Sequence, residues 1–139
     1  MFQVIREKAE LVHLNFFLKS IRDFIEKAGA SEEKIFDVIL TAEEILVNIM
    51  SYAYPENQKG EIEIHCQILE ADGEKKLKCV FIDEGKFFDI LQKESPDLSA
   101  PIETRSVGGL GIHLVKTLMD EVSYMRQVDK NILSVVKTI

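Results

Sequence analysis

Two polar side chains on one predicted helix have the chemistry and the spacing of a reactive site. Glu44 and Asn48 are four residues apart, so on a helix they project from the same face. A carboxylate beside a carboxamide can act as a general base and as an oxygen ligand for a metal ion. The alternative is a solvated helix face, because polar residues also line the exposed side of an amphipathic helix.

A second candidate, Asp83-Glu84-Gly85, lies where a predicted strand ends. The Asp83 carboxylate can accept a hydrogen bond from an exocyclic amine such as that of adenine. Gly85 allows the backbone to turn sharply, since glycine has no Cβ. The alternative is a turn that only terminates the strand.

A third candidate is the run Gly108-Gly109-Leu110-Gly111, which opens a predicted helix. Such glycines leave backbone N–H groups free at the positive end of the helix, where phosphate binds well. A P-loop would need Lys and Ser or Thr after its last glycine, whereas Ile112-His113 follows here. A Rossmann motif would follow a first strand, whereas this run lies near the C-terminus. Neither motif fits, and the run alone is equally consistent with a structural helix start.

Two helices in the first half of the chain must position Glu44 and Asn48. The spacing of apolar residues over Leu11–Ala28 predicts a first helix that ends at Gly29. Ser31 is the predicted N-cap of a second helix over about 32–52, which Pro55 terminates. On this second helix the apolar stripe expected to face a sheet is Ile35, Ile39, Ala42, Leu46, Ile49 and Ala53, and the polar window is Asp37, Thr41, Glu44, Asn48 and Ser51.

Strands must position the other two candidates. Alternating apolar residues over Glu61–Asp83 predict a hairpin with a tight turn at Asp72-Gly73, which places Cys66 opposite Cys79. A third helix is predicted from about residue 112 to 119. Two further strands are predicted over 121–128 and 132–139, joined by a turn at 129–131. Residues 84–107 lack periodicity, so a lid is expected over about 85–110. This order predicts an α+β two-layer sandwich, with helices on one face of a mixed, mostly antiparallel sheet.

The composition describes a single acidic globular domain over residues 1–139. Lys and Arg number 17 and Asp and Glu number 24, a net charge of −7, which argues against a nucleic-acid partner. There is no apolar run long enough to span a membrane and no signal-peptide pattern, so a cytoplasmic protein is expected. Cys66 and Cys79 are expected to be reduced core residues, with a redox disulfide as the alternative.

The three candidate motifs follow one another along the chain in an order that is typical of a known family. The chain resembles the Bergerat-fold (GHKL) ATPases, which include histidine-kinase ATPase domains, gyrase B, Hsp90 and MutL. Within them the chain is most similar to the small anti-sigma-factor serine/threonine kinases of the RsbW/SpoIIAB type, over about residues 16–139. Tyr52 is a departure, because the family often has His there. The stretches that carry the resemblance are Glu44–Asn48 with Ala53-Tyr54-Pro55, Asp83–Gly85 with Phe88-Asp89, and Gly109–Ile112 with Leu118–Val122.

The resemblance implies roles for these residues, with ATP and Mg²⁺ as cofactors. Asn48 would hold Mg²⁺, and Glu44 would activate the attacking group. Asp83 would read the adenine amine, and Gly85 would let the base approach. Arg105 would pair with the γ-phosphate. The other residues implied to contact the nucleotide are Phe88, Gly108, Gly109, Leu110, Gly111, Ile112, His113 and Leu114.

The resemblance also implies a function and partners. The chain would phosphorylate a Ser or Thr of a STAS-domain anti-anti-sigma protein, and it would sequester a sigma factor or another regulator in a partner-switching system. A homodimer is implied as well, with an exposed N-terminal strand or the first helix as its interface. The alternative is a regulatory module that binds nucleotide and switches a protein partner without kinase activity.

Overall fold

The structure is a computed structural model that describes residues 1–92 and 109–139, with side chains from Gly111 onward in the second range. Arg105 and Gly108, and most of the predicted lid, lie outside the described residues. The helices are α1 (Leu14–Lys27), α2 (Glu32–Tyr52) and α3 (Gly109–Leu118), with short 3-10 turns at Leu11–His13 and Ile90–Gln92. The strands are β1 (Phe2–Lys8), β2 (Glu61–Ala71), β3 (Glu74–Asp83), β4 (Glu121–Gln127) and β5 (Lys130–Thr138).

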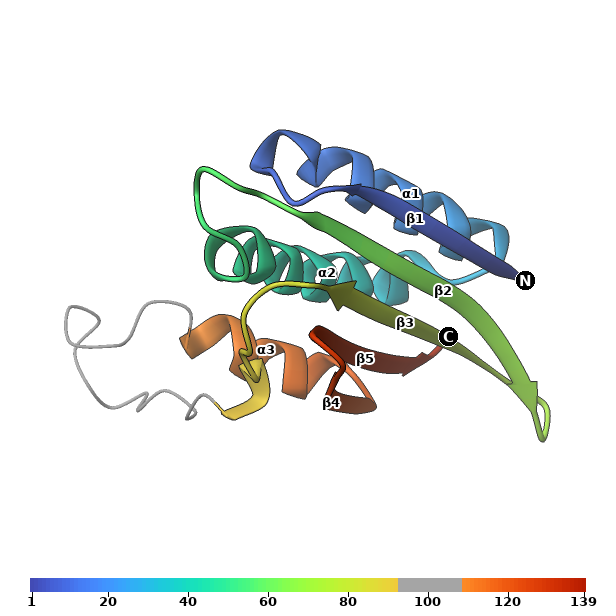
Figure 1. The fold of residues 1–139 in the computed structure, drawn as a ribbon. Coiled ribbons are helices and arrows are strands. Elements are labelled where there is room, and N and C mark those ends of the chain that lie inside the picture. The colour runs from blue at the N-terminus through green and yellow to red at the C-terminus, as the bar shows by residue number, and fades with distance from the viewer. Residues whose placement is uncertain (93–108) are drawn as a thin grey trace.

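The five strands form one sheet in the order β1-β2-β3-β5-β4, and the described helices cover one face of it (Figure 1). This confirms the predicted α+β two-layer sandwich. Every pairing among the described strands is antiparallel, so the sheet is not mixed. β1 is an edge strand whose bounds the sequence does not predict, because only Ile5 in it is buried and the apolar alternation is therefore weak.

The hairpin of β2 and β3 has the predicted register. Cys66 lies opposite Cys79, and the two Sγ atoms are 3.8 Å apart as free thiols in the core. Asp72 and Gly73 both have positive φ, 54° and 79°. Two consecutive residues in that region form the tight hairpin turn that matches the right-handed twist of the strands.

The second hairpin and α3 differ from the prediction at their ends. The turn between β4 and β5 consists of Val128 and Asp129, both with positive φ, and Asn131 belongs to β5. The predicted three-residue turn is therefore wrong, because Asn131 is an inward-facing strand residue despite being polar. α3 begins at Gly109, about three residues before the predicted start, so Gly109 and Gly111 lie within its first turn.

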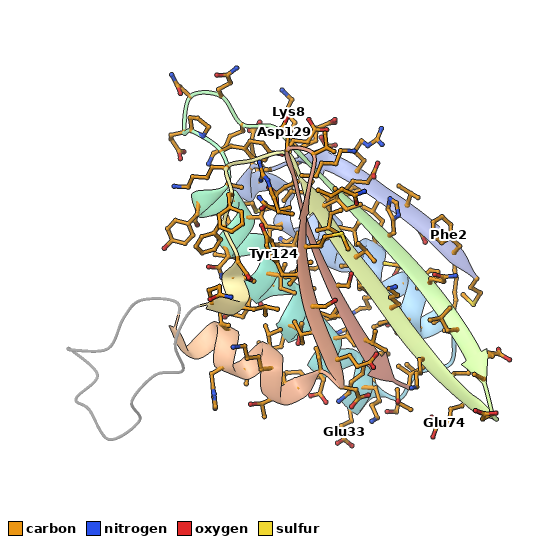
Figure 2. The ribbon with its side chains drawn as sticks, turned by 60° about the horizontal axis from the view of Figure 1, so that its bottom comes forward. Phe2, Lys8, Glu33, Glu74, Tyr124 and Asp129 are labelled. Carbon is orange, nitrogen blue, oxygen red and sulfur yellow. The ribbon has the colours of Figure 1, made fainter. Side chains whose placement is uncertain are left out.

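Apolar side chains from α1, α2, α3 and the inner sheet face form one continuous core. The Ser31 hydroxyl accepts a hydrogen bond from the Lys34 N–H at 3.3 Å, which confirms the predicted cap of α2. Thr41 and Asn48 of the predicted polar window are buried rather than solvated. Figure 2 shows Lys8 and Asp129 at one end of the sheet, with Glu33 and Glu74 at the other.

Candidate functional site

Asn48 is a buried amide on α2 with one of its ends already engaged. Its side chain is 5% exposed, and its Nδ2 donates a hydrogen bond of 2.7 Å to the backbone oxygen of Glu44. Within residues 1–92 and 109–139 the acceptor atom Oδ1 has no hydrogen-bond partner, so it is available to a ligand. A single amide oxygen suits Mg²⁺, which usually takes only one or two protein ligands and completes its shell with phosphate oxygens and water.

The Glu44 carboxylate extends from α2 to the first turn of α3. A Cβ atom built on Gly111 would come closer to Glu44 Oε2 than the 3.0 Å that real side chains respect. Gly111 is therefore the residue that lets the carboxylate approach this helix. The position is electrostatically favourable, since the N-terminus of a helix carries partial positive charge. The structure thus brings together the helix carboxylate and the glycine run.

Asp83 ends β3 with a buried carboxylate that is 4% exposed. Its Oδ1 accepts hydrogen bonds of 2.9 Å from the Gly85 N–H and from Asn131 Nδ2. Burial raises the pKa of Asp83, while these two donors and the positive charge of Arg126 oppose the rise. The carboxylate is therefore held in place as a hydrogen-bond acceptor in an apolar setting.

The turn after Asp83 packs tightly on the C-terminal end of α2. A Cβ on Gly85 would overlap the carbonyl group of Ala53, with the carbonyl carbon only 2.6 Å away. The Lys86 N–H donates a hydrogen bond of 2.9 Å to the same Ala53 oxygen. The need for glycine here thus comes from close packing of backbone on backbone.

One small cavity lies between α2 and the sheet, and it touches both Asp83 and Asn48. Its volume is about 30 Å³, whereas small-molecule pockets are typically ~300–1,000 Å³. The space between these side chains is therefore smaller than a purine needs. The lining is mostly apolar, which suits the flat faces of a base. The residues that line the cavity are Ile45, Asn48, Ile49, Ala53, Asp83, Phe88, Ile90, Tyr124, Asn131 and Leu133.

The remaining predicted ligand residues on α3 have mixed positions. The first turn holds Gly109, Leu110 and Gly111. Ile112 is 2% exposed and belongs to the hydrophobic core, so only its backbone is available to a ligand. His113 and Leu114 are half-buried further along the helix.

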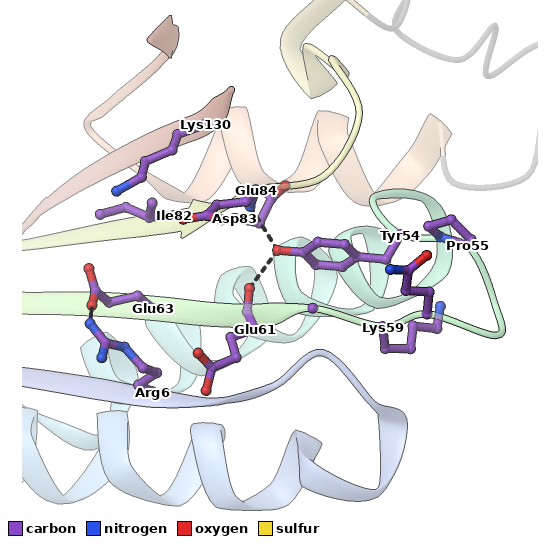
Figure 3. A pocket seen from close by; sticks show the side chains of 12 residues that line it. Arg6, Tyr54, Pro55, Lys59, Glu61, Glu63, Ile82, Asp83, Glu84 and Lys130 are labelled. Carbon is purple, nitrogen blue, oxygen red and sulfur yellow. Dashed lines mark hydrogen bonds and ion pairs between the residues drawn. The ribbon is translucent and has the colours of Figure 1, made fainter. Parts of the chain in front are cut away.

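Sequence reasoning missed the residues that hold the Asp83 turn. Tyr54, just after α2, donates a hydrogen bond of 2.7 Å to the Glu61 oxygen and accepts one of 2.7 Å from the Glu84 N–H (Figure 3). Arg126 Nη1 donates to the Gly85 oxygen at 2.8 Å. Ala53-Tyr54-Pro55 contributes to the family resemblance, but it does not by itself predict this contact. Arg126 and Asn131 could have been found by extending the alternation of the terminal strands, which places both side chains on the inner face of the sheet.

A larger hollow of about 700 Å³ lies on the other side of the Asp83 turn (Figure 3). Its lining includes Asp83, as that of the smaller cavity does, together with Arg6, Tyr54 and Lys130, but it does not include Asn48. Its charges are mixed, and Arg6 pairs with Glu63. The chemistry therefore points to the smaller cavity, where the amide and the buried carboxylate meet.

Residues 1–92 and 109–139 contain no group of three or more His, Cys, Asp or Glu side chains that could bind a metal. No helix among the same residues has the length and apolar character to cross a membrane.

Comparison with known proteins places the chain in a family. A profile of the histidine kinase-like ATPase domain matches residues 8–137. The serine-protein kinase RsbW of Bacillus subtilis (strain 168) is 35% identical over 101 residues, which cover 69% of this chain and 60% of that protein. The serine-protein kinase RsbW of Staphylococcus aureus (strain MSSA476) is 30% identical over 131 residues, which cover 91% of this chain and 80% of that protein.

Solved structures show the same fold. The RsbU and RsbW domains of a Mycobacterium tuberculosis protein match with a TM-score of 0.69 and 17% identity, over 99% of this chain and 32% of that one. A chain in the SiaB–SiaC complex of Pseudomonas aeruginosa matches with a TM-score of 0.58 and 17% identity, over 99% of this chain and 89% of that one. The chain belongs to the histidine kinase-like ATPase family and, within it, to the group represented by RsbW.

Proposed function

We propose that this chain is an ATP-dependent protein serine/threonine kinase that also acts as an anti-sigma regulatory factor. The observation that carries the proposal is the meeting of Glu44 with the first turn of α3, one helical turn from the buried amide of Asn48. A carboxylate at that place is not needed to bind a nucleotide. Relatives named as serine-protein kinases support the same activity. The chain spans 60% of the B. subtilis relative, so the activity of that whole protein is proposed here rather than transferred.

The residues of the cavity suit Mg-ATP. Asp83 would accept a hydrogen bond from the adenine amine, Gly85 would allow the base to approach, and Phe88 would lie against it. Asn48 Oδ1 would be the protein ligand of Mg²⁺, which supplies positive charge that neutralises the phosphate oxygens. The first turn of α3 would bind phosphates through its N–H groups. Arg105 and Gly108, outside the described residues, are proposed to complete this phosphate site.

Glu44 would supply the proton chemistry. A serine or threonine hydroxyl of the substrate attacks the γ-phosphorus of ATP, its proton passes to the Glu44 carboxylate, and ADP leaves with the electrons of the broken P–O bond. Positioning and charge stabilisation provide most of the catalysis in phosphoryl transfer. The Glu44 side chain extends from α2, and its carboxylate lies where a Cβ of residue 111 would be, a place that is open because residue 111 is glycine.

The substrate is proposed to be a STAS-domain anti-anti-sigma protein, and the sequestered target a sigma factor or a similar regulator. We also propose that the chain forms a homodimer and that it acts in the cytoplasm. The acidic balance of −7 makes a protein partner more plausible than direct contact with nucleic acid.

The test compares two neighbouring carboxylates of α2. Glu44→Gln should lower the rate of phosphotransfer by about 10²–10⁴-fold while ADP affinity stays within about twofold. Glu43→Gln is the matched control, because Glu43 is an exposed carboxylate on the same helix. Equal rates for the two variants would contradict the role of Glu44. Nucleotide binding without any phosphotransfer in the unsubstituted protein would favour the regulatory module without kinase activity.

A further inference from the structure

Asn131 forms a buried hydrogen-bonding centre beside Asp83. The two residues lie opposite each other across β3 and β5, and Asn131 is 5% exposed. Its Nδ2 donates hydrogen bonds to Asp83 Oδ1 at 2.9 Å and to the Lys86 oxygen at 2.8 Å. Its Oδ1 accepts hydrogen bonds from three donors: the Tyr124 hydroxyl, Arg126 Nη1 at 3.1 Å and the Phe88 N–H at 3.4 Å.

These five contacts allow only one orientation of the Asn131 amide. Reversing it would place Oδ1 against two acceptors, Asp83 Oδ1 and the Lys86 oxygen. The same reversal would aim the amide N–H groups at the donors that now serve Oδ1. Buried polar groups left without partners are strongly disfavoured, so the amide is fixed with its N–H toward Asp83.

The fixed orientation of the Asn131 amide makes the two oxygens of Asp83 inequivalent. Among the described residues, both donors to the carboxylate, Asn131 and Gly85, use Oδ1. Oδ2 accepts no hydrogen bond from the described residues, and Asp83 lines the small cavity, so Oδ2 is the oxygen available to a ligand there. Donors also favour the ionised form of a buried acid. The other charged or titratable groups around Asp83 are Arg126 and Tyr124 on β4, Tyr54 after α2, and Glu84 and Lys86 in the turn.

We infer that Asn131 is a positioning residue for adenine selectivity, because its N–H fixes Asp83 as an ionised acceptor whose Oδ2 faces the base. This inference rests on the proposed nucleotide site. An ionised carboxylate can only accept hydrogen bonds, so it pairs with the amine of adenine. Guanine has a carbonyl at that position and would need a protonated Asp83. Asn131 thus excludes guanine by controlling the state of its neighbour.

The test uses two nearly isosteric substitutions that differ by one donor. Asn131→Thr retains a hydroxyl that can donate to Asp83, whereas Asn131→Val does not, and both β-branched residues suit a strand. ADP and GDP affinities are measured by calorimetry from about pH 5.5 to about pH 8.5, the range in which a buried carboxyl without donors protonates. Asn57→Leu, at an exposed amide outside the site, is the control.

The unsubstituted protein and Asn131→Thr should prefer ADP to the same degree across this range. Asn131→Val should bind ADP about tenfold more weakly, and its preference for ADP over GDP should fall by at least about tenfold as the pH decreases. A selectivity that is independent of pH in Asn131→Val would overturn the inference alone. If Asn131→Val does not fold, Asn131→Ser and Asn131→Ala repeat the comparison. No ADP binding by the unsubstituted protein would overturn the proposed function as well.

Discussion

Adding a methyl group at Gly111 should separate folding from catalysis. In Gly111→Ala the new Cβ would overlap the Glu44 carboxyl group, and the nearest atoms all belong to that side chain. The carboxyl group is the far end of a flexible side chain, so it can rotate away while the backbone of α3 stays in place. The substitution therefore displaces the proposed base without damaging the core.

The expected magnitudes follow from this geometry. Alanine is better than glycine in a helix by up to about 1 kcal/mol, so stability should be unchanged or slightly higher. For a domain of this size that is a rise in Tm of at most about 4 °C. Displacing a general base by about 1 Å or more should cost about 10²-fold or more in phosphotransfer. ADP affinity should change little, because the Gly111 N–H remains.

The assay combines calorimetric melting with phosphotransfer rates. Thr117→Ala is the control in the same helix, since Thr117 is exposed and its hydroxyl donates a hydrogen bond to the His113 oxygen of the preceding turn. In a Glu44→Gln background, Gly111→Ala should lower the rate by less than about twofold further, because the two changes act on the same group. Full activity in Gly111→Ala would refute the reasoning, and so would a large loss of stability.

Three further predictions follow from the contacts of the site. Asn48→Ala should abolish the Mg²⁺ dependence of ATP binding, measured by calorimetry with and without EDTA; retained dependence would remove its metal role. Asp83→Asn should weaken ADP by about 30-fold or more with a much smaller effect on unfolding, because an amide N–H would face the adenine amine; unchanged affinity would contradict the adenine assignment. Burial raises the pKa of Tyr54 from 10.0 to about 12, so the folded protein keeps a proton that the unfolded chain releases above about pH 10. Stability should therefore be full below about pH 10 and fall by about 1 kcal/mol towards pH 12, allowing for partial exposure, and urea unfolding of Tyr54→Phe should lack this component.

The elements with strong local signals were predictable from the sequence. Ser31 and Pro55 bound α2, and the Asp72-Gly73 turn fixes the register of β2 and β3, because the apolar alternation agrees with that turn. The sequence predicts poorly those segments whose secondary structure depends on tertiary contacts. β1 is an edge strand with one buried residue, so its sequence carries almost no period-two pattern.

The sequence predicts which residues form the candidate site, but not the hydrogen bonds and contacts between them. Glu44, Asn48 and Asp83 could be selected by their chemistry and spacing. Asn131 looked like a turn residue because polar residues favour turns. Its burial depends on pairing with Asp83 across β3 and β5, which are 48 residues apart at that point. The contact between Glu44 and Gly111 likewise depends on how α3 packs against α2.

Transfer of phosphate to a serine or threonine of a partner protein can be observed by affinity capture from the source cell's lysate. The capture is performed with Mg-ATP and with Mg-ADP, and is followed by phosphopeptide mass spectrometry of the captured proteins. A small STAS-type protein should be retained with ADP and should become phosphorylated on Ser or Thr with ATP, but not when Glu44→Gln is used. Captured partners that never gain phosphate with Mg-ATP would contradict the kinase account.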